Sequence, residues 1–191
     1  MFLMKVCRAG FLIITFGLAA VQALAQDDAA AQAKIDSALS AAPAAITQDA
    51  TILDWSFDAD GKFVVLREGT NGWSCLPDEP TTEVNNPLCF DEAALTWVYA
   101  LVSGEAPNLT VPGFGYMLLG DEAFSNSNPG ATEPAADHWM STDPYMMFIL
   151  PSGVDLGGMS HDEHSPGPFV MWRGTPYQHI MVPAGVSHHD D

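Results

Sequence analysis

The first 25 residues constrain this chain most, because they have the three parts of a cleavable secretory signal. Lys5 and Arg8 provide a positive start, and an apolar run follows over residues 11–20. Ala23 and Ala25 then place small residues at the two positions that a signal peptidase reads. The run is about half the roughly 20 apolar residues that span a bilayer, which disfavours an uncleaved membrane anchor. The sequence therefore predicts that residues 26–191 fold after export, either in the periplasm or outside the cell.

The chain that remains after cleavage is short and strongly acidic. Removing 25 residues from 191 leaves 166, which is enough for one domain with a hydrophobic core. Lys5 and Arg8 leave with the signal, so 4 basic side chains remain against 24 acidic ones, a formal net charge of −20. Such a surface repels nucleic acid and anionic membranes, and no later segment is apolar over a membrane-spanning length. The charge fits solubility in a salty medium, and it also fits a cation or a small molecule as partner.

Two cysteines, Cys75 and Cys89, remain in the exported part of the chain. An even pair in an oxidising compartment predicts a disulfide. It would close a loop of 15 residues, for which the chain-entropy model gives about 3 kcal/mol of stabilisation. The enclosed segment contains three prolines and few apolar residues, so a crosslink would hold a segment that has no core of its own. A redox-active or metal-binding pair is the alternative, although the spacing is far from Cys-x-x-Cys.

Changes in residue pattern divide the exported chain into a lead-in, a domain and a tail. Residues 26–50 are rich in Ala, Gln and Asp, which predicts a helix ended by Pro43 or a partly disordered segment. Residues 51–185 are expected to form a single globular domain, and residues 186–191 a polar His/Asp tail. Apolar runs predict six strands, at residues 51–57, 62–68, 113–119, 145–150, 169–172 and 177–182. The turn at residues 58–61 joins the first two in a hairpin.

One amphipathic helix is predicted between these strands. Asp91 is a favourable N-cap, apolar residues recur at helical spacing from Ala94 to Val102, and Gly104 ends the pattern. Residues 69–90 and 120–143 show no clear strand pattern and are expected to be loops. Together these elements predict an α+β domain, an antiparallel sheet of about six strands with one or two packed helices. A β-sandwich that carries one helix is the alternative.

Three segments carry a resemblance to other proteins. They are residues 72–77 (GWSCLP), residues 87–89 (PLC) and residues 170–179 (VMWRGTPYQH). In these segments the chain resembles a group of uncharacterised exported bacterial proteins, and the likeness covers most of the chain after the signal. The resemblance implies a bacterial periplasmic or secreted setting. It implies no activity, cofactor or catalytic residue.

A histidine-rich loop is the first candidate for a chemical site. Four consecutive residues have side chains that bind metals: His161, Asp162, Glu163 and His164. Imidazoles and carboxylates suit Zn²⁺ or Cu²⁺, and His179 or His138 could supply a further ligand. Glycines and prolines on both sides favour a loop over a helix. The hypothesis is a labile site for copper or zinc, and the alternative is a solvated polar loop.

A second candidate site centres on His179, which lies in a predicted strand. Alternation along the strand puts Tyr177, His179 and Met181 on one face. His179 is then either a buried structural histidine or a pocket residue that binds a ligand or transfers a proton, with a carboxylate such as Asp143 nearby. Three more residues belong to this possible pocket: His138, Trp139 and Trp73. The two tryptophans could line a pocket, or they could shield the disulfide and one end of the sheet.

These features leave three hypotheses for function. The first is a periplasmic binding or accessory module for a transition-metal ion or a small apolar molecule. The second is an enzyme of unknown reaction that uses His179, and the third is a structural or interaction domain without a ligand. No pattern in the sequence assigns a catalytic residue, because the motifs of zincins, nucleophile elbows and phosphate-binding loops are all absent.

Overall fold

The structure is a computed structural model that describes residues 13–82, 84–131 and 139–185. The polar tail expected at residues 186–191 lies outside the described residues. Packing divides the chain into two units, Met1–Ala33 and Lys34–Asp191. The first unit contains most of the long helix α1 (Ile13–Ala38), which runs through the predicted cleavage site. Among the described residues, no helix combines the length and the apolar character that crossing a membrane requires.

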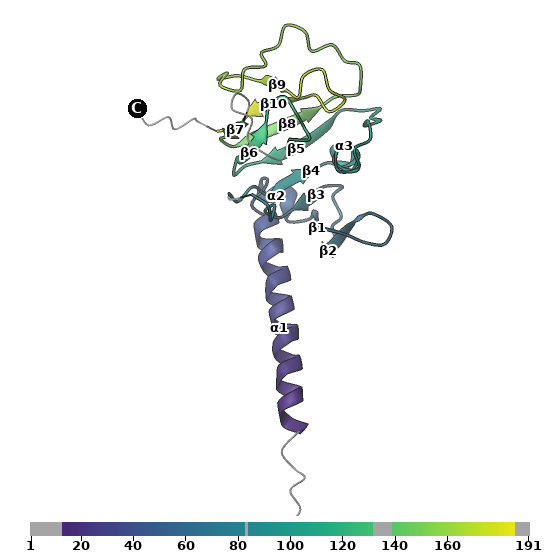
Figure 1. Ribbon diagram of the computed structural model, residues 1–191, viewed down its shortest axis with the longest axis vertical. Coiled ribbons are helices and arrows are strands. Elements are labelled where there is room, and N and C mark those ends of the chain that lie inside the picture. The colour runs from purple at the N-terminus through teal and green to yellow at the C-terminus, as the bar shows by residue number, and fades with distance from the viewer. Residues whose placement is uncertain (1–12, 83, 132–138, 186–191) are drawn as a thin grey trace, which may run out of the picture. The chain divides into compact units, whose positions relative to one another are not determined.

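The second unit is built on a large twisted sheet, whose strands can be followed in Figure 1. Within the described residues the sheet has eight strands in the order β2-β1-β3-β4-β5-β8-β10-β9. Neighbouring strands run antiparallel except β1 and β3, which are parallel. The strands are β1 (Thr51–Phe57), β2 (Phe63–Arg67), β3 (Ser74–Leu76), β4 (Leu88–Phe90), β5 (Gly113–Met117), β8 (Tyr145–Ile149), β9 (Phe169–Met171) and β10 (His179–Pro183). A separate antiparallel pair joins β6 (Asp121–Ser125) to β7 (Trp139–Thr142).

The α+β class and the mainly antiparallel sheet are confirmed, but the expected number of about six strands is too low. The additional strands lie in the two segments that the sequence predicts to be loops. β3 and β4 have three residues each, which is too short to show an alternating pattern. They form because the sheet pairs them, with Cys75 directly opposite Cys89. The alternative β-sandwich is not formed, since the second sheet has two strands.

The helix α3 (Glu92–Ser103) forms where the sequence predicts it. The Asp91 side chain accepts a hydrogen bond of 2.8 Å from the backbone N–H of Ala94, and Gly104 ends the helix with φ 72°. Gly113 of β5 lets the helix lie directly on the sheet, because a Cβ there would come within 2.5 Å of the Ala94 nitrogen. The helix buries three residues against the sheet: Ala94, Trp97 and Val98.

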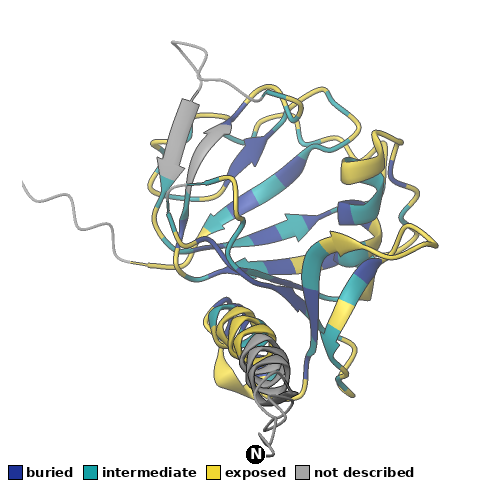
Figure 2. Ribbon diagram, turned by 60° about the horizontal axis from the view of Figure 1, so that its bottom comes forward, coloured by how far each residue is buried: buried dark blue, intermediate teal, exposed yellow. Residues whose placement is uncertain are grey.

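Each face of the sheet carries its own apolar cluster. The face covered by α3, called here the helix face, buries large residues such as Phe90, Met147 and Trp97. The opposite face, called here the disulfide face, buries a smaller cluster: Ala38, Ala41, Ala42, Ala50, Ile52, Cys75 and Cys89. Figure 2 shows the buried residues along the central strands and the exposed outer side of α3. The two sulfur atoms of Cys75 and Cys89 lie at disulfide-bonding distance, which agrees with the pairing expected from the sequence.

The segment of residues 34–50 packs on the disulfide face. It contains the end of α1 and the short helix α2 (Ala44–Thr47), and its alanines allow the backbone to approach the strands closely. The backbone N–H of Leu118 donates to the Ala41 carbonyl at 3.0 Å. Arg67 Nη2 donates to the carbonyls of Thr47 at 2.8 Å and Ala50 at 3.0 Å. The packed part of the chain therefore begins before residue 51, and α1 ends at Ala38, ahead of Pro43.

Candidate functional site

A cavity of about 200 Å³ lies on the helix face, between α3 and the sheet. Its walls come from α3 and from strands at both ends of the sheet, including β1, β8, β9 and β10. Most of the lining side chains are apolar, and three of them are tryptophans: Trp55, Trp97 and Trp172. Concave, mainly apolar cavities with a few polar groups are typical of sites for small molecules.

His179 projects from β10 into the wall of this cavity. Its side chain is 1% exposed, and its Nδ1 lies 3.0 Å from the carbonyl oxygen of Tyr177. Because a carbonyl oxygen only accepts hydrogen bonds, Nδ1 carries the hydrogen, and Nε2 of the neutral ring is an acceptor. Burial lowers the pKa of His179 to about 4, against a smaller opposite effect of the Tyr177 hydrogen bond. The imidazole is therefore neutral at pH 7.

Two tryptophans from different elements enclose His179. Trp97 of α3 and Trp172, which follows β9, stack with ring centroids 5.8 Å apart and an angle of 13° between their planes. Each of them meets the His179 ring edge-on, with centroids 5.1 Å apart. Trp97 Nε1 is buried and has no hydrogen-bond partner among the described residues. These contacts tie the helix to the last two strands at the cavity.

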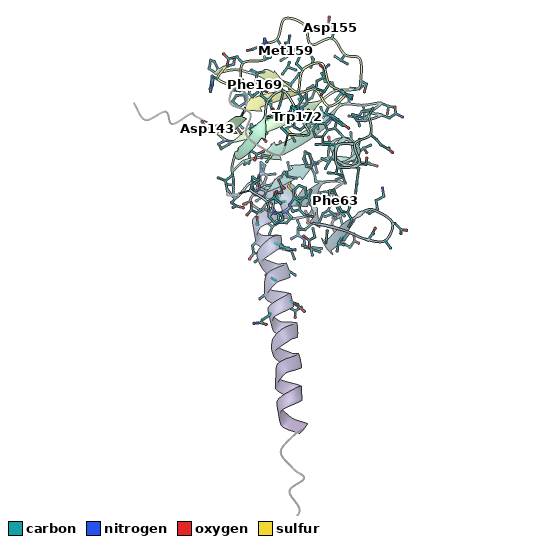
Figure 3. The ribbon with its side chains drawn as sticks, viewed as in Figure 1. Phe63, Asp143, Asp155, Met159, Phe169 and Trp172 are labelled. Carbon is teal, nitrogen blue, oxygen red and sulfur yellow. A yellow bond between two sulfur atoms is a disulfide. The ribbon has the colours of Figure 1, made fainter. Side chains whose placement is uncertain are left out.

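Trp172 adopts a backbone conformation that bulky residues rarely take. Its φ is 53°, and no other non-glycine residue in the described part of the chain has a positive φ. Such a conformation costs about 1–3 kcal/mol and persists only where the surroundings hold it. Here the Trp172 backbone N–H donates to the carbonyl of Asn126 at 2.9 Å, and its Nε1 donates to that of Ser125 at 2.6 Å. Figure 3 labels Trp172 in the region of the strands β8 and β10.

Polar groups gather at one part of the cavity wall. Asp121, the first residue of β6, accepts a hydrogen bond from Asn86 Nδ2 at 2.9 Å and one from the Tyr145 hydroxyl at 3.5 Å. The same hydroxyl lies 2.6 Å from the Met117 sulfur. Burial, and then the negative charge of Asp121, raise the pKa of Tyr145 well above its usual value of 10. Asp121 and Glu79 are the charged residues among the described lining, and both are acidic.

The histidine-rich loop does not line this cavity and belongs to the long connection between β8 and β9, which contains Asp155 and Met159 (Figure 3). His161 and His164 are exposed. The carboxylate of Asp162 accepts a hydrogen bond from the backbone N–H of His164 at 3.0 Å, and that of Glu163 accepts one from Asn126 Nδ2 at 3.0 Å. Within the described residues, no three His, Cys, Asp or Glu side chains are grouped so that they could hold a metal ion. His138 lies outside the described residues, so the copper or zinc site stays a prediction.

Two residues that the sequence expects near His179, Trp73 and Asp143, do not line its cavity. Trp73 packs on the disulfide face, where its ring meets that of Tyr116 with centroids 5.5 Å apart. This position fits the interpretation in which it shields the disulfide. Asp143 is exposed and does not line the cavity. Trp139 belongs to β7, and its side chain, like His138, is outside what the structure describes.

Sequence reasoning finds His179 but misses the rest of the cavity wall. Trp97 and Trp172 are 75 positions apart in the chain, and no local pattern indicates that their rings stack. Asp121 lies in a segment that is predicted to be a loop. A usable signal is Trp97 itself, because an aromatic residue beside the apolar stripe of a helix often faces the sheet beneath it.

Comparison with known proteins finds no relative that could indicate a function. The chain matches no protein-family model, no curated protein and no solved structure. The function is therefore argued from the residues that line the cavity.

Proposed function

We propose that this protein is an exported binding module that holds a small, mainly apolar molecule between α3 and the sheet. The observation that carries the proposal is the cavity of about 200 Å³ with three tryptophans and the neutral His179 in its wall. Filling such a cavity with an apolar molecule removes apolar surface from water, which contributes about 25 cal/mol per Å². The strained conformation of Trp172 adds support, because such conformations cluster at ligand sites.

The surroundings of His179 favour binding over catalysis. A residue that transfers protons at neutral pH needs a pKa near 7 and commonly a partner that orients its ring. Burial lowers the pKa of His179 to about 4, and the ring is oriented by a backbone carbonyl. The enzyme hypothesis pairs His179 with Asp143, which is exposed and does not line the cavity. These observations favour a module that holds its ligand unchanged.

Export through the N-terminal signal is part of the proposal. The basic start, the apolar run and the small residues before Gln26 support it. The described members of both apolar clusters begin at or after Ile35, so none of them lies before the predicted cleavage site. The Cys75–Cys89 pair suits an oxidising compartment. Mass spectrometry of the protein in an exported fraction should give a chain that begins at Gln26, whereas an intact cytosolic precursor with free thiols would contradict export.

A matched pair of leucine-to-tryptophan variants tests the binding site. The neutral, apolar dye N-phenyl-1-naphthylamine is titrated into residues 26–191, and its fluorescence reports transfer into an apolar cavity. Leu101→Trp adds bulk inside the cavity, whereas Leu119→Trp makes the same change at an exposed position outside it. We expect the dye to bind wild type and Leu119→Trp equally and to bind Leu101→Trp at least tenfold more weakly. No binding to wild type, or equal binding to both folded variants, would overturn the proposal.

A further inference from the structure

We propose that the cavity selects apolar molecules whose polar head donates hydrogen bonds, as a hydroxyl or an ammonium does, and rejects those headed by a carboxylate. This inference rests on the proposed binding function and specifies the class of ligand. Its basis is the set of polar atoms in the cavity wall: most side-chain donors there already have protein partners, whereas Nε2 of His179 is an acceptor without one among the described residues.

The first acceptor is Nε2 of His179. The Tyr177 carbonyl takes the hydrogen on Nδ1, so the other nitrogen of the neutral ring has a lone pair and no hydrogen. Within the described part of the chain, no residue donates a hydrogen bond to Nε2. His179 lines the cavity, between the rings of Trp97 and Trp172. A hydroxyl or ammonium group can donate to this nitrogen, and a carboxylate cannot.

The side-chain donors in the wall are mostly occupied by the protein itself. Trp55 Nε1 donates to the Pro77 carbonyl at 2.9 Å, and Trp172 Nε1 donates to the Ser125 carbonyl at 2.6 Å. The Tyr145 hydroxyl and Asn86 Nδ2 are both engaged within the polar group around Asp121. Trp97 Nε1 is the exception, because it has no partner among the described residues. A hydroxyl can accept from this donor as well as donate elsewhere, whereas an ammonium can only donate.

The charges in the cavity wall also favour an ammonium head over a carboxylate head. Asp121 and Glu79 line the cavity, and no Lys or Arg is among the described lining residues. A ligand carboxylate would lose its hydration and approach two groups of like charge without a cation to compensate. An ammonium would gain from the same two groups. Burial also keeps the His179 ring uncharged at pH 7, so it offers an anion no positive charge.

Three eight-carbon probes with different heads test the inference in residues 26–191. Octylamine, 1-octanol and octanoate are titrated at pH 7.5 by calorimetry, and by displacement of the naphthylamine dye. Because the exported chain has a net charge of −20, the series is repeated at 0.5 M NaCl to suppress general attraction of cations. We expect the amine and the alcohol to bind at least tenfold more tightly than octanoate under both conditions.

Two variants test whether residues in the cavity wall cause this selectivity between the probes. Asp121→Asn removes a charge with little change in shape and should narrow the difference between octylamine and octanoate at least threefold. His179→Phe removes the Nε2 acceptor and should weaken the alcohol and the amine at least fivefold, with octanoate unchanged. Should His179→Phe fail to fold, as judged by near-UV circular dichroism, Asp121→Asn and the wild-type series decide the result. Trp97→Phe should weaken the alcohol more than the amine.

The outcomes separate this inference from the proposed function. If octanoate binds as tightly as the other two probes, the selectivity is wrong while the cavity remains a binding site. If neither variant narrows the difference in affinity between octanoate and the other two probes, the side chains of Asp121 and His179 do not select the ligand. If no probe binds and the dye does not distinguish Leu101→Trp from Leu119→Trp, the binding function fails as well.

Discussion

The two faces of the large sheet are packed with side chains of different size. On the disulfide face, four buried alanines and two half-cystines bring the chain before residue 51 into direct contact with the strands. On the helix face, tryptophans, phenylalanines and methionines hold α3 on the sheet, and a cavity of about 200 Å³ remains among them. Small side chains allow close approach of two backbones, whereas large rings from distant elements seldom fill all the space between them.

Under the proposed function, the disulfide face of the sheet contributes mainly to stability and the helix face contains the binding site. The disulfide face contains the crosslink and tight packing, and the helix face contains the polar acceptors and the strained Trp172. Changes on the disulfide face should therefore alter the free energy of unfolding and leave ligand affinity unchanged. Changes that fill the cavity on the helix face should lower ligand affinity with little change in the free energy of unfolding, and the pH dependence of His179 is expected on this face alone.

The largest effect is expected from removing the crosslink on the disulfide face. The double variant Cys75→Ala/Cys89→Ala should unfold with a free energy about 3 kcal/mol lower than wild type, because the unfolded chain regains the entropy of a 15-residue loop. Urea unfolding of residues 26–191 measures the change. Dye affinity in the absence of urea is the control and should stay within twofold. Equal urea midpoints for the two proteins would mean that the pair adds no stability.

A second comparison places a phenylalanine on each face. Ile52→Phe overfills the packed disulfide face, where Ile52 is 0% exposed, and should lower the free energy of unfolding by about 1–3 kcal/mol. Leu101→Phe extends into the cavity and should change it by less than about 0.5 kcal/mol, because the added ring atoms enter existing space. Thermal or urea unfolding of both variants gives the numbers. A similar loss in both would show that the helix face has no room for a larger side chain.

The third prediction concerns pH and the helix face. The pKa of His179 is about 4 when folded and near 6.5 when unfolded, so the unfolded state binds more protons between these values. Stability from this residue is therefore complete above pH 6.5 and is lost as pH falls, by about 2 kcal/mol between pH 7 and pH 5. The difference between wild type and His179→Gln in urea unfolding at several pH values isolates this effect. Parallel pH profiles for the two proteins would contradict it.

The smallest effect is expected at the start of α3, which covers the cavity. Asp91 accepts hydrogen bonds from the backbone N–H groups of Ala94 at 2.8 Å and Phe114 at 3.0 Å. Asp91→Ala should therefore lower the free energy of unfolding by about 1 kcal/mol. Glu92→Ala, which removes the neighbouring exposed carboxylate, is the control and should cost less. Should the two variants lose the same stability, the cap would not be what holds this end of the helix.

Elements with a regular local pattern are predicted well from the sequence. β1, β2, β8, β10 and α3 form within a few residues of their expected bounds, because each carries enough turns or alternations to show a period. β3 and β4 carry too few residues for a period, and they form through pairing with strands that are distant in the chain. The antiparallel pair of β6 and β7 is also missed, because the sequences DEAFS and WMST show no alternation of apolar and polar residues.

The candidate site is predicted in part. The sequence singles out His179, and the structure places it, buried like Met181, in the cavity wall. Whether His179 is a structural or a pocket histidine depends on its neighbours. These neighbours include Trp97 and Trp172, which belong to other elements, so the local sequence does not indicate them. The disulfide pairing needs only the count of cysteines after the predicted cleavage site, so sequence suffices for it.

The sequence by itself determines the net charge, the cysteine pair and the faces of the long elements, because each depends on composition or on neighbours within a few positions. The tertiary structure decides that three tryptophans enclose a cavity, that Trp172 is held in a left-handed conformation, and that Asp121 meets Tyr145. These features are contacts between residues far apart in the chain. No local period encodes such contacts, since they exist only once the sheet has brought the strands together.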